Sequence, residues 1–244
     1  MNDIADALVA RTRAFALETQ SITFSFEGYI YNPLDYAWQV HELYLRQYVH
    51  HEPDLFFLGM NPGPFGMAQT GVPFGEIEAV EQWMHLSGSI GKPKREHPAR
   101  PVLGFSTTRS EVSGNRLWSL MQERFGSADA FFSCNAVMNY CPLVFMDGGK
   151  TGKNVVPEKL PKEERNQLDR VCDSYLDDIV NLVEPRALVG VGVFARKRLE
   201  SCARRLHLDI PVTSILHPSP GNPQANNGWD RKVTAQLREA GLWS

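Results

Sequence analysis

Four short apolar runs, each bounded by turn residues, mark the chain at residues 55–59, 131–137, 187–192 and 212–216. Within each run apolar side chains occupy successive positions and do not alternate regularly with polar ones. This pattern is typical of strands that are covered on both faces, as in a parallel sheet. We therefore expect the four runs to form the central sheet of the protein.

Helical periodicity separates these runs. It is strongest over residues 161–183, where apolar side chains recur at i, i+3, i+4 and i+7 after a proline at the start. The other predicted helices have a weaker periodicity and span residues 3–16, 35–50, 75–86, 115–125, 194–206 and 229–240. Strands that alternate with helices favour an α/β fold with a parallel sheet.

Four further segments have no helical pattern. Residues 22–31 are aromatic and β-branched, and we expect them to be extended. Residues 62–75 and 88–110 are rich in glycine, proline and small side chains, and residues 143–161 are also poor in helical pattern. Long loops in a compact domain are usually functional or disordered, so these segments are candidates for a functional role.

Three polar residues follow the predicted strands: Asn61, Asn139 and His217. In open α/β sheets, binding sites form beyond the carboxyl ends of the strands. The order of the elements therefore predicts that the three side chains face one crevice. His217 precedes a proline, which restricts its backbone to extended geometry and gives its ring a defined direction.

The length and composition indicate one globular unit. The chain has 244 residues, of which 43% are hydrophobic and 22% charged, ordinary values for a globular protein. We interpret residues 1–21 as an N-terminal helical arm and residues 22–244 as a single domain. No apolar run approaches the ~18 residues that a membrane helix needs, and the first residues make a poor secretory signal. We therefore expect an intracellular protein with no membrane partner.

The charge is unevenly distributed. The net charge of −3 does not by itself indicate a nucleic-acid partner. Residues 186–244 nevertheless hold nine Lys/Arg and four Asp/Glu. This basic quarter either steers one face toward a polyanion or forms the solvated face of a helix. Charge alone leaves both interpretations open.

The cysteines do not indicate a metal site. Cys134, Cys141, Cys172 and Cys202 form no CxxC pair. Their apolar or helical surroundings are typical of reduced, buried thiols. We therefore expect no metal at these positions.

A glycine motif at residues 190–195 offers a rival hypothesis, because it matches the G-x-G-x-x-A pattern of a dinucleotide site. That motif requires an acidic residue at the end of the following strand, whereas Asp209 precedes the strand. We interpret Gly190 and Gly192 as positions that let a helix pack tightly against the sheet, and we expect no cofactor.

Two loops carry a resemblance to a known family. Residues 59–75, GMNPGPFGMAQTGVPFG, and residues 217–220, HPSP, closely resemble the signature loops of the single-strand-selective monofunctional uracil-DNA glycosylases. Further matches extend the resemblance over residues 22–242 and lie at 31–33, 110–114, 139, 141–143, 222–226 and 228–229. The resemblance implies a three-layer α/β fold of the uracil-DNA glycosylase type, with a central four-stranded parallel sheet flanked by helices.

The resemblance also implies a function. The family's enzymes hydrolyse the N-glycosidic bond of uracil and of 5-substituted uracils such as 5-hydroxymethyluracil, in single- and double-stranded DNA. They flip the base out and leave an abasic site for base excision repair. The implied partner is DNA that contains uracil or oxidised or deaminated pyrimidines. We expect a monomer, in the cytoplasm or nucleoid of a bacterium or the nucleus of a eukaryote.

The resemblance assigns a role to each site residue. His217 stabilises the anion of the leaving base, and Asn61 holds the attacking water, because a neutral amide cannot take a proton. The residues expected to bind the base are Met60, Gly63, Met67, Phe74 and Asn139, with Phe74 stacked on the base and Asn139 on its edge. The residues expected to contact DNA are Ser113, Gly114, Ser219, Pro220, Gly221, Asn222 and Gln224.

Two positions depart from the family pattern. Relatives carry an arginine after HPSP that wedges into the base stack, and this chain has Gly221 there. Asn227 stands where a lysine is familiar. Either Asn222 or Gln224 replaces the wedge, or the enzyme depends more on single-stranded or weakly paired substrates. We also expect the loss of two positive charges to weaken nonspecific affinity for DNA, which is mostly electrostatic.

Two alternatives remain. One is a glycosylase of the same fold that prefers other deaminated bases, such as xanthine or hypoxanthine. The other is a non-catalytic DNA-binding homologue. The presence of both Asn61 and His217 favours a catalyst, since binding alone requires neither.

Overall fold

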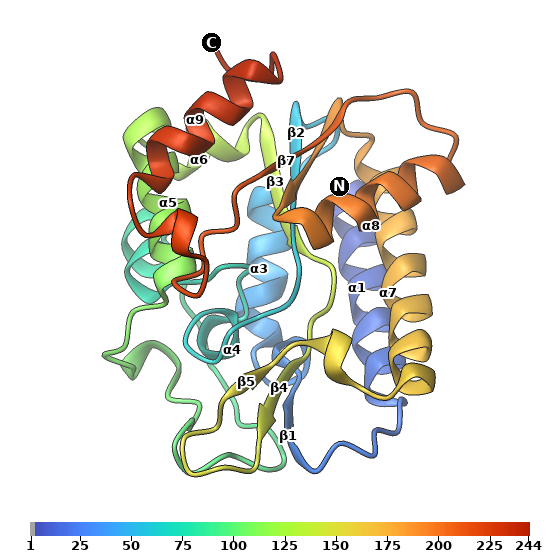
Figure 1. Cartoon of the computed structure of the whole chain (residues 1–244), viewed down its shortest axis with the longest axis vertical. Coiled ribbons are helices and arrows are strands. Elements are labelled where there is room, and N and C mark those ends of the chain that lie inside the picture. The colour runs from blue at the N-terminus through green and yellow to red at the C-terminus, as the bar shows by residue number, and fades with distance from the viewer. Residues whose placement is uncertain (1–2) are drawn as a thin grey trace.

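A four-stranded parallel sheet lies at the centre of the computed structural model, which describes residues 3–244 (Figure 1). Its strands run in the order β3-β2-β6-β7. They are β2 Leu55–Gly59, β3 Asn135–Asn139, β6 Ala187–Val191 and β7 Val212–Ile215. Every residue of β2, β3 and β6 is buried, as expected for strands covered on both faces. The predicted fold class is confirmed.

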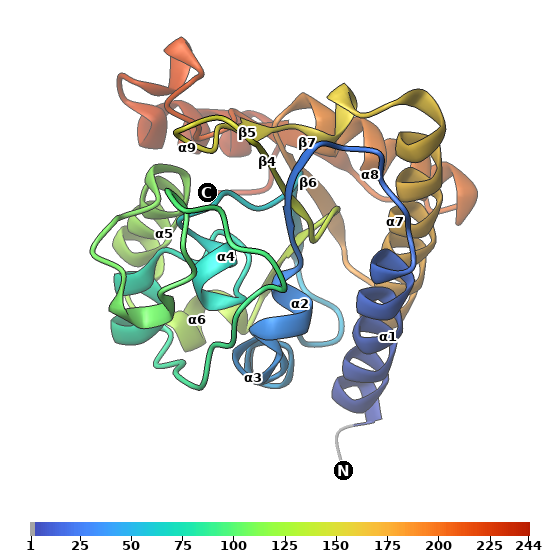
Figure 2. The same ribbon diagram turned by 90° about the horizontal axis from the view of Figure 1, so that it is seen from below.

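The helices lie in two groups on either side of this sheet, with α1, α7 and α8 on one side and α5, α6 and α9 on the other (Figures 1 and 2). The longer ones are α1 Asp3–Gln20, α3 Trp38–Tyr48, α5 Val112–Phe125, α7 Lys162–Val183, α8 Val193–Arg205 and α9 Trp229–Glu239. The shorter ones are α2 Pro33–Tyr36, α4 Met67–Thr70 and α6 Ala128–Phe132. Among residues 3–244, no helix combines the length and the apolar character that crossing a bilayer requires.

A second, smaller sheet lies at one end of the molecule (Figure 1). It pairs β4 Val144–Asp147 antiparallel with both β1 Gly28–Tyr31 and β5 Asn154–Val155. The extended segment expected at 22–31 contains β1. The sequence did not predict β4 and β5, because β4 pairs with a strand more than a hundred residues earlier and β5 is only two residues long.

Two predicted elements have different bounds in the structure. Phe131 and Phe132, placed in a strand, belong to α6, which Ser127 caps by accepting a hydrogen bond from the Ala130 amide at 3.1 Å. Both rings are buried, and a fully buried apolar run does not distinguish a helix from a strand. The helix expected at 75–86 is shorter, because its helical residues span 77–83 and form a π-helical turn over Ala79–Trp83.

α1 lies against α7 (Figure 2). The Phe15 and Tyr175 rings are stacked at 3.9 Å, and the Thr12 and Tyr175 hydroxyls lie 2.8 Å apart. Arg11 adds an ion pair to Asp178 at 2.6 Å. The predicted boundary between an arm and a domain at residue 21 remains a prediction, and Met1 and Asn2 lie outside the described residues.

The glycine motif at residues 190–195 has a packing role. A Cβ on Gly190 would lie 2.2 Å from the Arg196 nitrogen in the first turn of α8. A side chain there would therefore push α8 off the sheet. This contact supports the interpretation of the motif as helix packing.

All four cysteines are free thiols. Cys141, Cys172 and Cys202 are buried, and Cys134 is half-buried. Burial raises the pKa of the Cys172 and Cys202 thiols, so these side chains are protonated and unreactive at neutral pH.

His41 is a buried polar residue that supports the loop after β2. Its Nδ1 donates to the Gly71 carbonyl at 2.7 Å, and its Nε2 is buried without a partner. Burial, partly offset by that hydrogen bond, lowers the pKa of His41 from 6.5 to about 4. The ring is therefore neutral at pH 7, and protonating it opposes folding.

This buried ring predicts a loss of stability in mild acid. The contribution of neutral His41 is fully present above pH 6.5, the ordinary pKa of histidine, and is lost as the pH falls through about 4. The loss amounts to about 3 kcal/mol. Chemical denaturation at pH 7 and pH 4 should show wild type losing that much more unfolding free energy than His41→Asn, whose amide nitrogen can still donate to Gly71. Parallel pH profiles for the two proteins would contradict this prediction.

Candidate active site

A cavity of about 250 Å³ opens beyond the carboxyl ends of β2 and β3 and beside the loop that follows β7. Asn61, Asn139 and His217 all line it, so the three strand ends do converge. The other predicted residues that line it are Met60, Gly63, Met67, Phe74, Ser113, Ser219 and Pro220.

Asn139 ends β3 and is only 9% exposed. Its Nδ2 lies 3.3 Å from the Met67 sulfur. A thioether is a weak acceptor, so this contact places the amide without saturating it. The amide is therefore available to a polar ligand in the cavity.

Phe74 lines the cavity from a strained backbone. Its φ of +52° is in the left-handed region, which costs a bulky residue about 1–3 kcal/mol. The Trp118 indole stabilises this conformation by donating to the Phe74 carbonyl at 2.8 Å. Such strain is found where a side chain must point in one direction.

Gly59 makes the arrangement of these two side chains possible. A Cβ at this position would lie 2.2 Å from Asn139 Oδ1 and 2.7 Å from the Phe74 ring. Both groups therefore occupy the space that any other residue would fill. Gly59 was not among the predicted site residues, although a glycine at the end of a fully buried strand was a usable signal.

Gly59→Ala is expected to reduce activity on any ligand that uses the Asn139 amide, because the new methyl group displaces that amide or the Phe74 ring. We expect a loss of at least about tenfold in kcat/KM with little change in secondary structure by circular dichroism. Gly148→Ala is the matched control, because Gly148 is exposed outside the cavity lining and a Cβ there meets only the Glu27 carbonyl at 3.6 Å. Equal effects of the two substitutions would contradict the assignment.

His217 has a defined tautomer. Its Nδ1 accepts a hydrogen bond from the Ser219 amide at 3.1 Å, so the proton of the neutral ring is on Nε2. Burial lowers the pKa of His217 below its ordinary value of 6.5. At neutral pH the side chain is therefore an uncharged hydrogen-bond donor through Nε2.

Asn61 is held by its amide nitrogen. Nδ2 donates to the carbonyls of Pro62 and Leu143, at 3.2 and 3.4 Å. With Nδ2 engaged, Oδ1 is the atom left to accept a hydrogen bond within the cavity. The amide can orient a water molecule but cannot deprotonate it.

Glu111, which the sequence analysis did not assign, forms another part of the wall. It caps α5 by accepting from the amides of Ser113 and Gly114, and burial raises the pKa of its carboxyl. Its acidic side chain just before a helix was a detectable capping signal. Gly114 is buried behind this cap and is not among the lining residues.

The β4–β5 hairpin supplies Asn154 and Val156 to the wall. Neither was predicted, because the strand pairing that brings the hairpin to this edge was not predicted. Their contribution depends entirely on the second sheet.

The loop that carries His217 is braced from α5. Arg116 donates to the Pro218 carbonyl at 2.8 Å and to Asn226 Oδ1 at 3.1 Å. Asn222 donates to the His217 carbonyl at 3.4 Å. Gly221 and Gln224 are exposed farther along the loop, outside the cavity lining.

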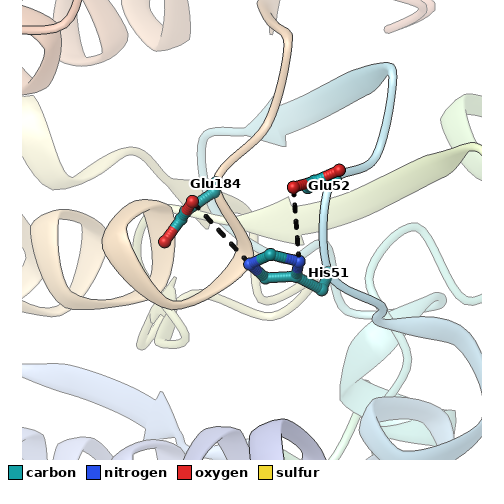
Figure 3. Close-up of side chains that lie close together, drawn as sticks. All are labelled: His51, Glu52 and Glu184. Carbon is teal, nitrogen blue, oxygen red and sulfur yellow. Dashed lines mark ion pairs between the residues drawn. The ribbon is translucent and has the colours of Figure 1, made fainter.

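A separate exposed cluster, His51, Glu52 and Glu184, lies before β2 and β6, at the opposite ends of these strands (Figure 3). The His51 ring nitrogens lie 3.8 Å from each carboxylate. All three side chains are in water, and exposed pairs of this kind contribute little to stability. The cluster lies apart from the cavity and takes no part in its chemistry.

Comparison with known proteins identifies the family. The uracil-DNA glycosylase superfamily model matches residues 46–238. A single-strand selective monofunctional uracil-DNA glycosylase of Rattus norvegicus is 46% identical over 215 residues, which cover 88% of this chain and 77% of that protein. The chain belongs to this family. The protein of the same name from Bos taurus is 44% identical over 92% of this chain and 82% of its own length.

The fold of the family extends to more distant proteins. The crystal structure of Pedobacter heparinus SMUG2 superimposes with a TM-score of 0.65 at 17% identity, over 96% of this chain and 98% of that one. At this low identity the likeness concerns the fold alone. Family membership agrees with the resemblance carried by the two signature loops.

Proposed function

We propose that this protein is a monofunctional DNA glycosylase that hydrolyses the N-glycosidic bond of uracil and 5-substituted uracils in single- and double-stranded DNA. The observation that carries the proposal is the convergence of Asn61, Asn139 and a neutral His217 on one cavity. The relatives are named single-strand selective monofunctional uracil-DNA glycosylases, which supports the removal of uracil. DNA with uracil or with oxidised or deaminated pyrimidines is the proposed partner, in an intracellular compartment, with the protein as a monomer.

Asn139 reads the base in this proposal. Its NH₂ donates to O4 of uracil and its carbonyl accepts from N3–H, while Phe74 covers the face of the ring. Cytosine presents an amine where uracil has O4, so two donors would meet. A buried polar group without a partner costs about 1–3 kcal/mol, and cytosine is rejected.

His217 and Asn61 divide the chemistry. As the glycosidic bond breaks, negative charge develops on the base, and the Nε2–H of His217 stabilises it at O2. Positive charge develops on the sugar, which then needs only a weak nucleophile. Oδ1 of Asn61 holds the water that attacks C1′. The water oxygen bonds to C1′, its proton is released to solvent, and the base leaves with the bonding electrons.

The lining explains two finer points of the proposal. None of the lining residues within 3–244 is a lysine, so no amine is placed to form a Schiff base, and the reaction ends at an abasic site. The cavity wall is open at Gly63, because a Cβ built on this residue would meet only Glu111 Oε1. This opening supports the proposal that the cavity accepts a uracil with a 5-hydroxymethyl group.

The test uses purified protein on oligonucleotides that contain uracil, 5-hydroxymethyluracil, thymine, hypoxanthine or xanthine, in single and double strands. Alkali after the reaction should cleave at uracil and 5-hydroxymethyluracil, and Asn61→Ala should be inactive or nearly so. Nicking before alkali would contradict a monofunctional reaction. Preference for hypoxanthine or xanthine would replace the proposed substrate, and binding without excision would indicate a non-catalytic homologue.

Gly221→Arg is expected to raise excision from duplex DNA. The exposed loop tip at Gly221 has no side chain to fill the gap left by a flipped base, and arginine adds both bulk and positive charge. We expect a severalfold gain in kcat/KM on duplex uracil and a smaller change on single strands. Unchanged duplex activity with intact single-strand activity would remove this explanation.

A further inference from the structure

Phe65 is the one residue between Met60 and Met67 that does not line the cavity. It is half-buried, and its ring lies under two guanidinium groups instead. The Cζ of Arg100 is 4.7 Å from the ring centroid and that of Arg109 is 5.1 Å. Two cations are therefore held over one aromatic ring of the loop whose other residues line the cavity.

Arg100 is held by the surrounding structure, whereas the Arg109 side chain is held by its contact with Phe65. Arg100 Nε donates to the Gly152 carbonyl at 3.1 Å, and the Tyr31 hydroxyl donates to the Arg100 carbonyl at 2.8 Å. Arg109 is exposed and stands two residues before Glu111, which lines the cavity. Guanidinium groups stacked on an aromatic ring lose little freedom when they bind an anion.

No acidic group neutralises this pair. In the part of the chain that the structure describes, neither Arg100 nor Arg109 forms an ion pair with a carboxylate. Two like charges over one ring repel each other, and an anion between them would offset that repulsion. The β4–β5 hairpin adds exposed Lys150 and Lys153 on the side of Arg100. This local excess of positive charge contrasts with a net charge of −3.

We propose that Phe65, Arg100 and Arg109 form a binding site for a backbone phosphodiester that flanks the flipped nucleotide. The proposal rests on the proposed function, because it takes DNA as the ligand. The loop of residues 62–66 then has two faces. Its inner face lines the base cavity, and Phe65 on its outer face supports the cations that hold the strand. Charge-assisted contacts from arginine suit phosphate oxygens.

The test measures binding of a single-stranded oligonucleotide with one tetrahydrofuran abasic analogue, which needs no excision. Arg109→Gln should raise Kd about fivefold in 0.1 M salt and lower the slope of log Kd against log salt by about 0.7, the value for one lost phosphate contact. Arg186→Gln is the control for the loss of one exposed positive charge, because Arg186 lies just before β6, at the amino ends of the strands and away from the cavity. Phe65→Leu, which keeps both charges, should weaken binding less than Arg109→Gln.

A neutral methylphosphonate, placed at one linkage at a time, locates the contact. Wild type should lose affinity when one linkage next to the analogue is neutral. Arg109→Gln, which already lacks the contact, should show no further loss of affinity when that same linkage is neutral. Equal effects of Arg109→Gln and Arg186→Gln, or full sensitivity of Arg109→Gln to every neutral linkage, would overturn the site. Uracil excision by wild type is measured separately, so failure of the glycosylase proposal is distinguished from failure of this one.

Discussion

His217→Ala is expected to slow uracil excision under single-turnover conditions by about 10²–10³-fold, the usual cost of one lost oxyanion donor. The Nε2–H of His217 is directed by the Ser219 amide at Nδ1, so alanine removes an oriented donor. The donor acts on charge that develops only in the transition state. Kd for the substrate should therefore change little, because the ground-state base carries no full negative charge at O2.

The pH dependence provides an independent check on His217. Burial holds the pKa of this ring below 6.5, so the neutral form that accepts from Ser219 persists through neutral pH. Protonation of Nδ1 breaks that hydrogen bond and frees the ring to turn. The wild-type rate should be level above pH 6.5 and fall in more acid solution, whereas His217→Ala should lack that decline. A loss of excision rate below tenfold in His217→Ala would contradict the assigned role. So would a decline of the rate in acid that this variant retains unchanged.

Asn139→Asp is expected to lower kcat/KM for uracil by about 100-fold. The ionised carboxylate only accepts hydrogen bonds, so it opposes O4 of uracil and leaves that acceptor unpaired in a buried site, at a cost of about 1–3 kcal/mol or more for a charged group. Excision kinetics on uracil at pH 8 measure the effect. Unchanged kinetics would exclude Asn139 as the residue that reads the base.

Cytosine offers a second measurement on the same variant. The exocyclic amine of cytosine is a donor that the new carboxylate accepts, so the preference for uracil over cytosine should fall. Asn139→Ala is the matched control, since it removes both contacts and should weaken uracil excision without favouring cytosine. A preference that falls equally in the two variants would show that cavity shape, rather than the amide, selects the base.

Much of the sheet could be predicted because its strands are covered on both faces, which requires unbroken apolar runs. Residues 55–59 and 187–191 follow this rule, and the structure places both in strands. The same rule failed at Phe131, since a short buried helix requires the same residues. Periodicity distinguishes helix from strand only where one face meets water.

The candidate site divides in the same way. Asn61, Asn139 and His217 were predicted to face one crevice from their position after strands, and they all line the cavity. The partners that orient them were not predicted. Gly59 makes room for the Asn139 amide, and Ser219 sets the tautomer of His217. The first role joins segments eighty residues apart, and the second depends on the turn that the His217 loop adopts in the folded protein.

The sequence by itself determined which polar residue follows each central strand: an asparagine follows the first strand, another follows the second and a histidine follows the fourth. It also determined the family, because the signature loops are contiguous stretches that need no fold to be compared. Only the tertiary structure decided which walls surround these residues, since β4 pairs with β1 across more than a hundred residues and brings Asn154 to the cavity. The pairing of distant strands is not encoded in any local pattern, because it depends on which surfaces the whole chain leaves available.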